Sequence, residues 1–305
     1  MIQHQRQAWP AYNLIFAAIL WGLLWIPLQR FAEQGFNGFW ASSVMYGFAV
    51  TLGCVLMMGR WRELGMSPGK LLGISLASGW CNLTFIVAVA EGDAARVVLL
   101  FYLSPVWTIL LGIVALKEKP SRAAWYVCLV AIVGAMAMLW NPSIGMPWPH
   151  NRFEWLAISS GMSFAIMNVL IRDLQTVSVR TKAFMSWVGV FIVACVWLGV
   201  QWRFSGSSHG GGVLSAHDFV PKVDAWVWWS CVVLGLAAIV PMTLSVQYGV
   251  TKFPVYKSSI ILLTEVAVTV VSWQLLSDNQ MTLKDWIGGS LIVSASVLFA
   301  LRVER

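Results

Sequence analysis

Long apolar segments alternate with short polar connections along almost the whole chain. A transmembrane helix needs about 20 mostly apolar residues to cross the hydrocarbon layer of a bilayer. We predict one such helix over each of ten segments: 11–29, 38–59, 70–90, 94–116, 122–140, 153–171, 183–204, 226–249, 254–276 and 283–301. The pattern therefore predicts an all-α integral membrane protein, with residues 1–305 forming a single membrane domain.

The composition also indicates a membrane protein, and it limits the classes of molecule that the protein is expected to bind. Of the 305 residues, 59% are hydrophobic and 11% are charged, against about a quarter charged in soluble domains. The net charge is +7, but the basic residues occur in ones to threes between apolar runs, which argues against a nucleic-acid partner. The five cysteines lie within apolar segments without a CxxC pair, so we predict no metal site and no cofactor.

The distribution of Lys and Arg predicts the orientation of the chain. These residues favour the cytoplasmic side of short loops. With the amino terminus inside, only six of the 20 lie outside: Arg30, Arg96, Arg152, Arg203, Lys222 and Lys284. We therefore predict that both termini are cytoplasmic, in a multi-pass protein of the plasma membrane, which in a bacterium is the inner membrane.

A weak internal repeat divides the chain into two halves. The segment 103–106 (Leu-Ser-Pro-Val) aligns with 263–266 (Leu-Thr-Glu-Val), and at the same offset Leu116 aligns with Leu276. Five predicted helices separate the two copies, so the second copy crosses the membrane in the opposite direction. This predicts two inverted five-helix repeats, 11–140 and 153–301, an arrangement that many transporters use.

Short motifs in the first half carry a family resemblance. They are Trp21-Gly22 in the first predicted helix, 103–105 (Leu-Ser-Pro) in the fourth, and 116–118 (Leu-Lys-Glu) before a fifth helix that contains Gly134. This pattern resembles the drug/metabolite transporter superfamily, specifically its EamA-type ten-helix members. The resemblance implies a carrier with a central cavity lined mainly by helices 1, 3, 4, 6, 8 and 9. It also implies a function that is often the export of amino acids or related metabolites.

The second half departs from this pattern at two positions. In the alignment of the two halves, Asp278 is the counterpart of Glu118. Glu265 is the counterpart of Pro105, at a position where the first half predicts a proline. Ionisable residues inside a membrane are costly and are often functional. Glu265 could bind a coupled proton, pair with an ammonium group, or stay protonated and donate a hydrogen bond to a neighbouring helix. It is our first candidate for substrate binding and for proton coupling.

Other polar groups in the predicted helices 4 and 9 accompany Glu265. Helical spacing places Ser258, Glu265, Thr269 and Ser272 on one face of the ninth helix. In the fourth helix, Pro105 removes a backbone donor and predicts a bend, close to Phe101 and Tyr102. The bend could serve a binding cavity or helix packing alone.

Several further residues are candidates for lining the site. Trp21 and Trp25 share a helix face, as do Trp80 and Thr84. An aromatic wall could hold an amine by cation–π attraction of about 0.5–2 kcal/mol per contact, although core packing explains aromatic residues equally well. Asn168 and Gln247 are uncharged polar candidates that interhelical hydrogen bonding would also explain. Arg96 and Lys257 could face the cavity or extend to the headgroups.

The sequence carries no HExxH, Walker A or Rossmann motif, and we predict that the protein is not an enzyme. Our hypothesis is a secondary transporter that exports a small amine-bearing or zwitterionic metabolite, such as an amino acid, by alternating access. The alternative is a facilitator or efflux carrier for organic cations such as quaternary amines. We expect a small-molecule substrate, the lipid bilayer as surroundings, and a monomer or homodimer.

Overall fold

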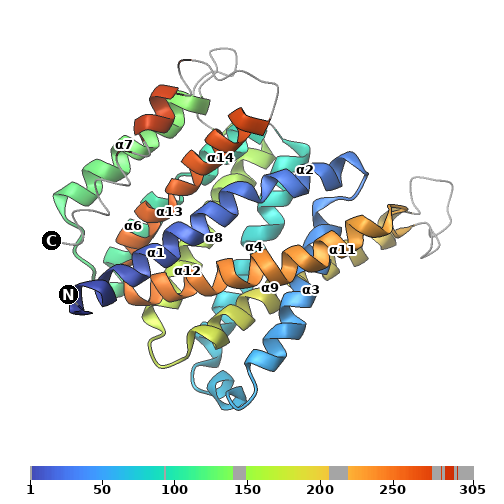
Figure 1. The fold of residues 1–305 in the computed structure, drawn as a ribbon, viewed down its shortest axis with the longest axis horizontal. Coiled ribbons are helices and arrows are strands. Elements are labelled where there is room, and N and C mark those ends of the chain that lie inside the picture. The colour runs from blue at the N-terminus through green and yellow to red at the C-terminus, as the bar shows by residue number, and fades with distance from the viewer. Residues whose placement is uncertain are drawn as a thin grey trace.

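The structure is a computed structural model that describes residues 2–92, 94–139, 149–205 and 219–276, together with 283, 286–291 and 294. Within these residues the chain is helical and contains no strand (Figure 1). The first half contains α1 (Ile2–Leu23), α2 (Trp25–Glu33), α3 (Gly38–Leu56), the 3₁₀ turn η1 (Trp61–Gly65), α4 (Pro68–Glu91), α5 (Ala94–Phe101), α6 (Ser104–Leu116) and α7 (Arg122–Leu139). The second half contains α8 (Arg152–Asp173), α9 (Val179–Ser205), α11 (Ala225–Leu234), the π-helical turn η4 (Gly235–Ile239), α12 (Val240–Lys252), α13 (Val255–Leu262) and α14 (Thr264–Leu276).

These helices match the apolar segments of the sequence. Seven stretches in the described ranges are long and apolar enough to cross a bilayer, and Ser104–Leu116 and Arg122–Gly134 are shorter apolar helices. Each of the first nine predicted segments coincides with one helix or with consecutive helical pieces. Most of the tenth, 283–301, lies outside the described residues. The chain therefore has the all-helical, apolar character that was predicted for a membrane protein.

Two helix interruptions occur at equivalent positions of the two halves. The chain is interrupted between α5 and α6, and again at Leu263 between α13 and α14. At each interruption a backbone N–H bonds to a carbonyl three residues earlier: Leu103 to Leu100 at 3.3 Å, and Leu263 to Ile260 at 3.2 Å. The alignment of the sequence repeat pairs these same positions, Leu103 with Leu263.

The sequence predicted a bend only at the first of these positions. Pro105 lies in the first turn of α6, where its missing N–H costs nothing. The second interruption has no proline. There the Thr264 hydroxyl donates to the Ile261 carbonyl at 2.8 Å, a local bond of the kind that competes with the regular helical ladder.

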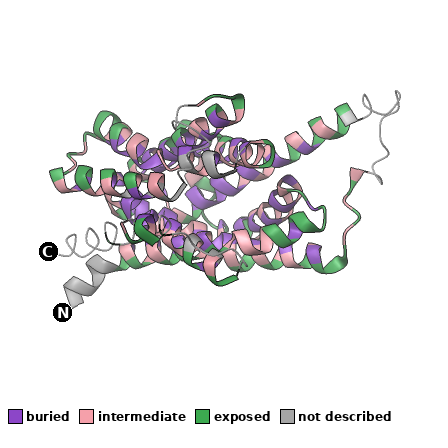
Figure 2. Cartoon of the chain, turned by 90° about the horizontal axis from the view of Figure 1, so that it is seen from above, coloured by how far each residue is buried: buried purple, intermediate pink, exposed green. Residues whose placement is uncertain are grey.

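Close backbone contact between α4 and α9 lies at the centre of the molecule. A Cβ atom added at Gly189 would collide with the backbone of Ser75, and one added at Gly79 would lie 2.7 Å from the Gly189 carbonyl oxygen. Small residues let helix backbones approach in this way. α4 also packs along α8, and α3 along α9. In Figure 2, the buried residues gather inside the molecule and the exposed residues lie on its outer side.

Acidic residues in connecting segments hold the starts of later helices. Glu63 in η1 accepts hydrogen bonds from the Ser178 N–H at 2.8 Å and the Thr181 hydroxyl at 2.7 Å, at the beginning of α9. Arg60 donates to the other carboxylate oxygen at 3.1 Å. Burial by itself would raise the pKa of Glu63, but these hydrogen bonds outweigh it and lower the pKa to about 2. Glu63 therefore caps α9 as a carboxylate.

We predict that Gly189→Ala lowers the free energy of unfolding by about 1–3 kcal/mol, because the added methyl group forces two backbones apart. Gly199→Ala is the matched control on the same helix, since a Cβ atom at Gly199 meets nothing within 4 Å. The control should be neutral or slightly stabilising. Thermal unfolding in detergent measures both, and equal unfolding temperatures for the two variants would contradict the close approach.

A second prediction concerns the cap formed by Glu63. Glu63→Ala should cost about 0.5–2 kcal/mol at neutral pH, as the loss of a helix cap does. Because the folded pKa is lowered from 4.5 to about 2, the stabilisation is present above pH 4.5 and disappears as the pH falls towards 2. The difference in unfolding temperature between parent and variant should thus shrink between pH 6 and pH 3. Glu91→Ala, at an exposed position, is the control, and a difference that does not change with pH would contradict the role of Glu63.

Candidate functional site

The polar stripe of α14 faces the junction of α1 and α2. A Cβ atom added at Gly22 would lie 2.8 Å from both the Glu265 carbonyl oxygen and the Val268 Cβ, so α1 and α14 touch at the level of Glu265 (Figure 1). One turn along, the Trp25 indole N–H donates to the Ser272 hydroxyl at 2.9 Å. The structure therefore places Trp25 against the same helix face that carries Glu265.

The carboxyl group of Glu265 lies beside the interruption between α13 and α14. It is half-buried in the first turn of α14, where the partial positive charge of a helix start favours an anion. Tyr102, at the equivalent interruption between α5 and α6, lies close enough to interact with it electrostatically. Within the part of the chain that the structure describes, the Glu265 side chain has no hydrogen bond or ion pair. The two interruptions thus bring a phenol and a carboxyl group with unused acceptors together.

An aromatic cluster extends from Tyr102 across α8 to α1. The Phe101 ring lies 6.2 Å from Tyr102, 5.0 Å from Phe85 and 5.9 Å from Phe164, and Phe164 lies 5.9 Å from Trp21 with an edge-to-face angle of 64°. We call Trp21, Phe85, Phe101, Tyr102 and Phe164 the aromatic cluster. Three of its members are sequence candidates, whereas Phe85 and Phe164 were not predicted.

Two buried amide side chains lie on α8 and α12. Asn168 follows Phe164 by four residues on the same face of α8 and is 2% exposed. Gln247 on α12 is 1% exposed and donates to the Ser186 hydroxyl on α9 at 3.0 Å. The carbonyl oxygens of both amides are buried and have no hydrogen-bond partner among the residues that the structure describes. A buried unsatisfied acceptor costs about 1–3 kcal/mol, so both oxygens are available to a ligand that donates hydrogen bonds.

The remaining sequence candidates differ in their surroundings. Trp80 is 48% exposed and makes no ring contact with the aromatic cluster among the described residues. The Thr84 and Thr269 hydroxyls each donate to a carbonyl of their own helix, at 2.8 and 3.0 Å. Lys257 is half-buried near the start of α13, and the side chain of Arg96 lies outside the described part. Asp278 also lies outside it.

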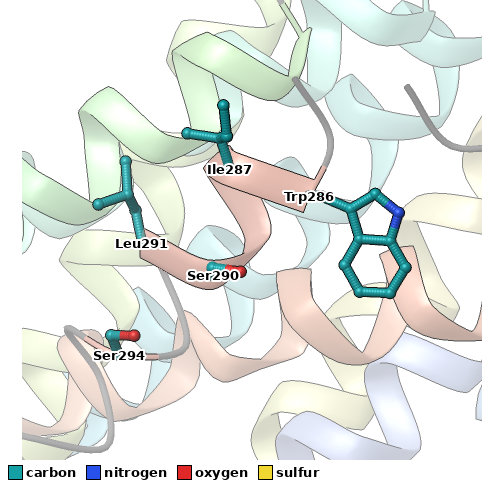
Figure 3. A pocket seen from close by; sticks show the side chains of 5 residues that line it. All are labelled: Trp286, Ile287, Ser290, Leu291 and Ser294. Carbon is teal, nitrogen blue, oxygen red and sulfur yellow. The ribbon is translucent and has the colours of Figure 1, made fainter. Parts of the chain in front are cut away.

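An open groove on the molecular surface is separate from this site. It is formed by a helical segment of the predicted tenth helix, where Ile287 and Leu291 point to one side and Trp286 to the other (Figure 3). Trp286 and Ile287 are 56% and 51% exposed, as expected for side chains that face lipid. The groove contains none of the candidate residues.

The described side chains indicate what this site can do. They form no cluster of three or more residues that could hold a metal ion. The candidate site offers a carboxyl group, aromatic faces and amide oxygens, which suit a ligand with an ammonium or other donor group.

The chain is similar to several known proteins. Residues 8–140, from α1 to the end of α7, match the EamA-like transporter family. This half of the chain is therefore similar to EamA-type transporters. The chain is 24% identical to the protein RarD of Streptomyces exfoliatus over 94% of this chain and 87% of that protein. It is also 23% identical to an uncharacterized transporter of Pseudomonas aeruginosa over 50% of each chain, so it spans about half the length of that relative.

A solved crystal structure shares the fold, with a TM-score of 0.72 at 15% identity over 97% of this chain and 99% of the other. The predicted resemblance to EamA-type transporters is therefore confirmed. The family match, the bacterial relatives and the apolar helices point to a multi-pass protein of the inner membrane that acts as a transporter and not as an enzyme.

The carbonyl oxygen of the Gln247 side chain gives a test that separates binding from packing. Gln247→Met keeps a similar side-chain length and removes both this buried unsatisfied acceptor and the hydrogen bond to Ser186, two changes with opposite effects on stability. We predict that the unfolding temperature of this variant stays the same or rises, while its rate of substrate uptake at low concentration falls, because a binding group has been exchanged for stability. Vesicle uptake and thermal unfolding measure the two effects. A destabilised variant with normal uptake would show that Gln247 is a packing residue.

Proposed function

We propose that this EamA-type transporter exports a small amine-bearing or zwitterionic metabolite, such as an amino acid, by alternating access. In this proposal ten helices form two inverted repeats, 11–140 and 153–301, with both termini in the cytoplasm. Glu265 binds the ammonium group of the substrate or the coupled proton. The aromatic cluster and Trp25 form the wall, and Asn168 and Gln247 accept hydrogen bonds.

Two observations support the repeat arrangement. The interruptions that precede Ser104 and Thr264 have the same backbone hydrogen bonds, at positions that the alignment of the two halves pairs. Residues 8–140, which match the EamA-like family, extend over nearly the same range as the first predicted repeat. Interrupted helices at the middle of a membrane are a common way to build a transporter site.

The position of the Glu265 carboxyl group carries the substrate proposal. It is half-buried, lies at an interrupted helix beside Tyr102, and has no hydrogen-bond partner among the residues that the structure describes. An ammonium group pairs with a carboxylate strongly in such surroundings, because hydrogen bonds to charged groups contribute about 1.5–3 kcal/mol. The proposed direction of transport, export, is based on the family resemblance alone.

The aromatic cluster favours a second candidate function, the carriage of organic cations such as quaternary amines. Trp21, Phe101 and Phe164 are linked by ring contacts of 5.9 Å, and aromatic faces attract cations that cannot donate hydrogen bonds. A facilitator of this kind would not accumulate substrate when a pH gradient is imposed. A proton-coupled carrier would.

We predict that Glu265→Gln weakens substrate binding about 10- to 100-fold, as expected for the loss of about 1.5–3 kcal/mol from a charged hydrogen bond. It should also abolish the dependence of uptake on an imposed pH gradient. Uptake into vesicles measures both, and Glu33→Gln at an exposed acid is the control. An unchanged rate with unchanged pH dependence would refute the role of Glu265.

A thermal-shift screen against amino acids, polyamines and quaternary amines supplies the substrate for that assay, because a ligand stabilises the folded state by mass action. Stabilisation by amino acids or polyamines that Glu265→Gln removes would support the first function. Stabilisation by quaternary amines alone would support the second.

A further inference from the structure

A fully buried lysine joins three helices at one end of the molecule. Lys182 is 0% exposed. Its ammonium group donates to the Ile171 carbonyl on α8 at 2.8 Å and to the Thr251 hydroxyl on α12 at 2.9 Å. The sequence had placed Lys182 in a loop before a helix at 183, but α9 begins at Val179 and includes it.

The same turn of chain is held by further side chains. Arg172 donates to the Thr251 carbonyl at 2.6 Å, and Gln175 donates to the same oxygen at 3.1 Å. Glu118, which follows α6, accepts from the Val255 N–H at 3.0 Å and lies 3.7 Å from Arg172. The turn between α12 and α13, residues 251–255, is therefore held by α8, by α9 and by the segment after α6.

This arrangement is costly for a purely structural contact. The partners that the structure gives the Lys182 ammonium group are a carbonyl and a hydroxyl, and Arg172 and Lys252 are close enough to repel it. Burial of a charge is expensive, and apolar residues often replace buried ionic groups without loss of stability. A network of hydrogen bonds that is formed in one arrangement of the helices and lost in another is typical of a segment that switches between two discrete arrangements.

The location of Lys182 connects it with the candidate site. On α9, Ser186 follows it by one turn, and on α12, Gln247 precedes Thr251 by one turn, and these two side chains are hydrogen-bonded at 3.0 Å. The positions of Lys and Arg along the sequence assign the 251–255 turn to the cytoplasmic side. With this predicted orientation, Lys182 lies between the buried amides and the cytoplasm.

We propose that Lys182, Arg172, Gln175 and Glu118 form a cytoplasmic clamp on the 251–255 turn, and that this clamp must open before substrate passes between the central site and the cytoplasm. The proposal rests on the alternating-access function proposed above. The clamp closes the cytoplasmic end in this structure. Opening separates the Lys182 ammonium group from Thr251 and releases α12 and α13 from α8.

The test is thiol labelling from the cytoplasmic side in a chain whose five native cysteines are replaced by alanine. Ser186→Cys is the reporter behind the clamp, because Ser186 is 5% exposed. Ser160→Cys is the reference on the outer half of α8, at a residue that is 0% exposed. A membrane-impermeant maleimide is applied to inside-out vesicles without substrate.

We predict that Lys182→Met accelerates labelling at position 186 severalfold and leaves labelling at position 160 unchanged. Arg180→Met is the matched control, since Arg180 is an exposed cation in the same turn of α9 and should change neither rate. An unchanged rate at position 186 would overturn the clamp. Equal acceleration at both positions would also overturn it, because Lys182 would then hold the whole fold together.

If Lys182→Met does not yield folded protein, Thr251→Val replaces it. This variant removes only the hydroxyl that accepts from Lys182, and the same selective acceleration at position 186 is expected. No acceleration would overturn the proposal. The measurement needs no substrate, so an incorrect substrate class or a silent Glu265→Gln variant would leave its outcome unaffected.

Discussion

Backbone polar groups in a bilayer have no water to bond, and this constraint determines the rest of the structure. It requires continuous helices wherever a segment faces lipid, and it restricts interruptions to places that protein or an aqueous cavity covers. The interruptions at Leu103 and Leu263 obey this restriction. One is covered by α8, which contacts α5 and α6, and the other by α1, which contacts α13 and α14. Polar side chains can be accommodated at these interruptions, because neighbouring helices already cover backbone groups that lack a helical hydrogen bond there.

Close packing and helix capping then set the positions of the interrupted helices. At Gly79 and Gly189 the backbones of α4 and α9 touch, which fixes the central helices at a separation that larger residues would not permit. The helix starts are held by acids from other connections: Glu63 bonds to the start of α9 and Glu118 to the start of α13. In this way, segments far apart in sequence fix where α14 presents Glu265.

The sequence predicted much of this arrangement because its strongest signals are local. Apolar length located the helices, Pro105 located one interruption, and the alignment of the two halves paired it with Glu265. The unpredicted parts depend on tertiary contacts. Leu263 interrupts a helix without proline, Phe164 joins the aromatic cluster only because α8 passes between Phe101 and Trp21, and Lys182 is buried because α9 starts a turn earlier than its apolar pattern. Trp80 has the expected spacing, but its side chain is 48% exposed.

Glu265 and Lys182 show how one chain can use buried charge in two ways. The Glu265 carboxyl group is half-buried near Tyr102 and has no hydrogen-bond partner among the described residues, which is why we propose it as the group that receives a cation. The Lys182 ammonium group is enclosed, and its bonds to Ile171 and Thr251 are made with the protein itself. An open charge favours exchange of a ligand, whereas an enclosed charge favours one closed geometry until its partners move. In the proposed mechanism, binding and closure therefore fall to different residues, and the hydrogen-bonded pair Ser186 and Gln247 lies one helical turn from Lys182 and Thr251.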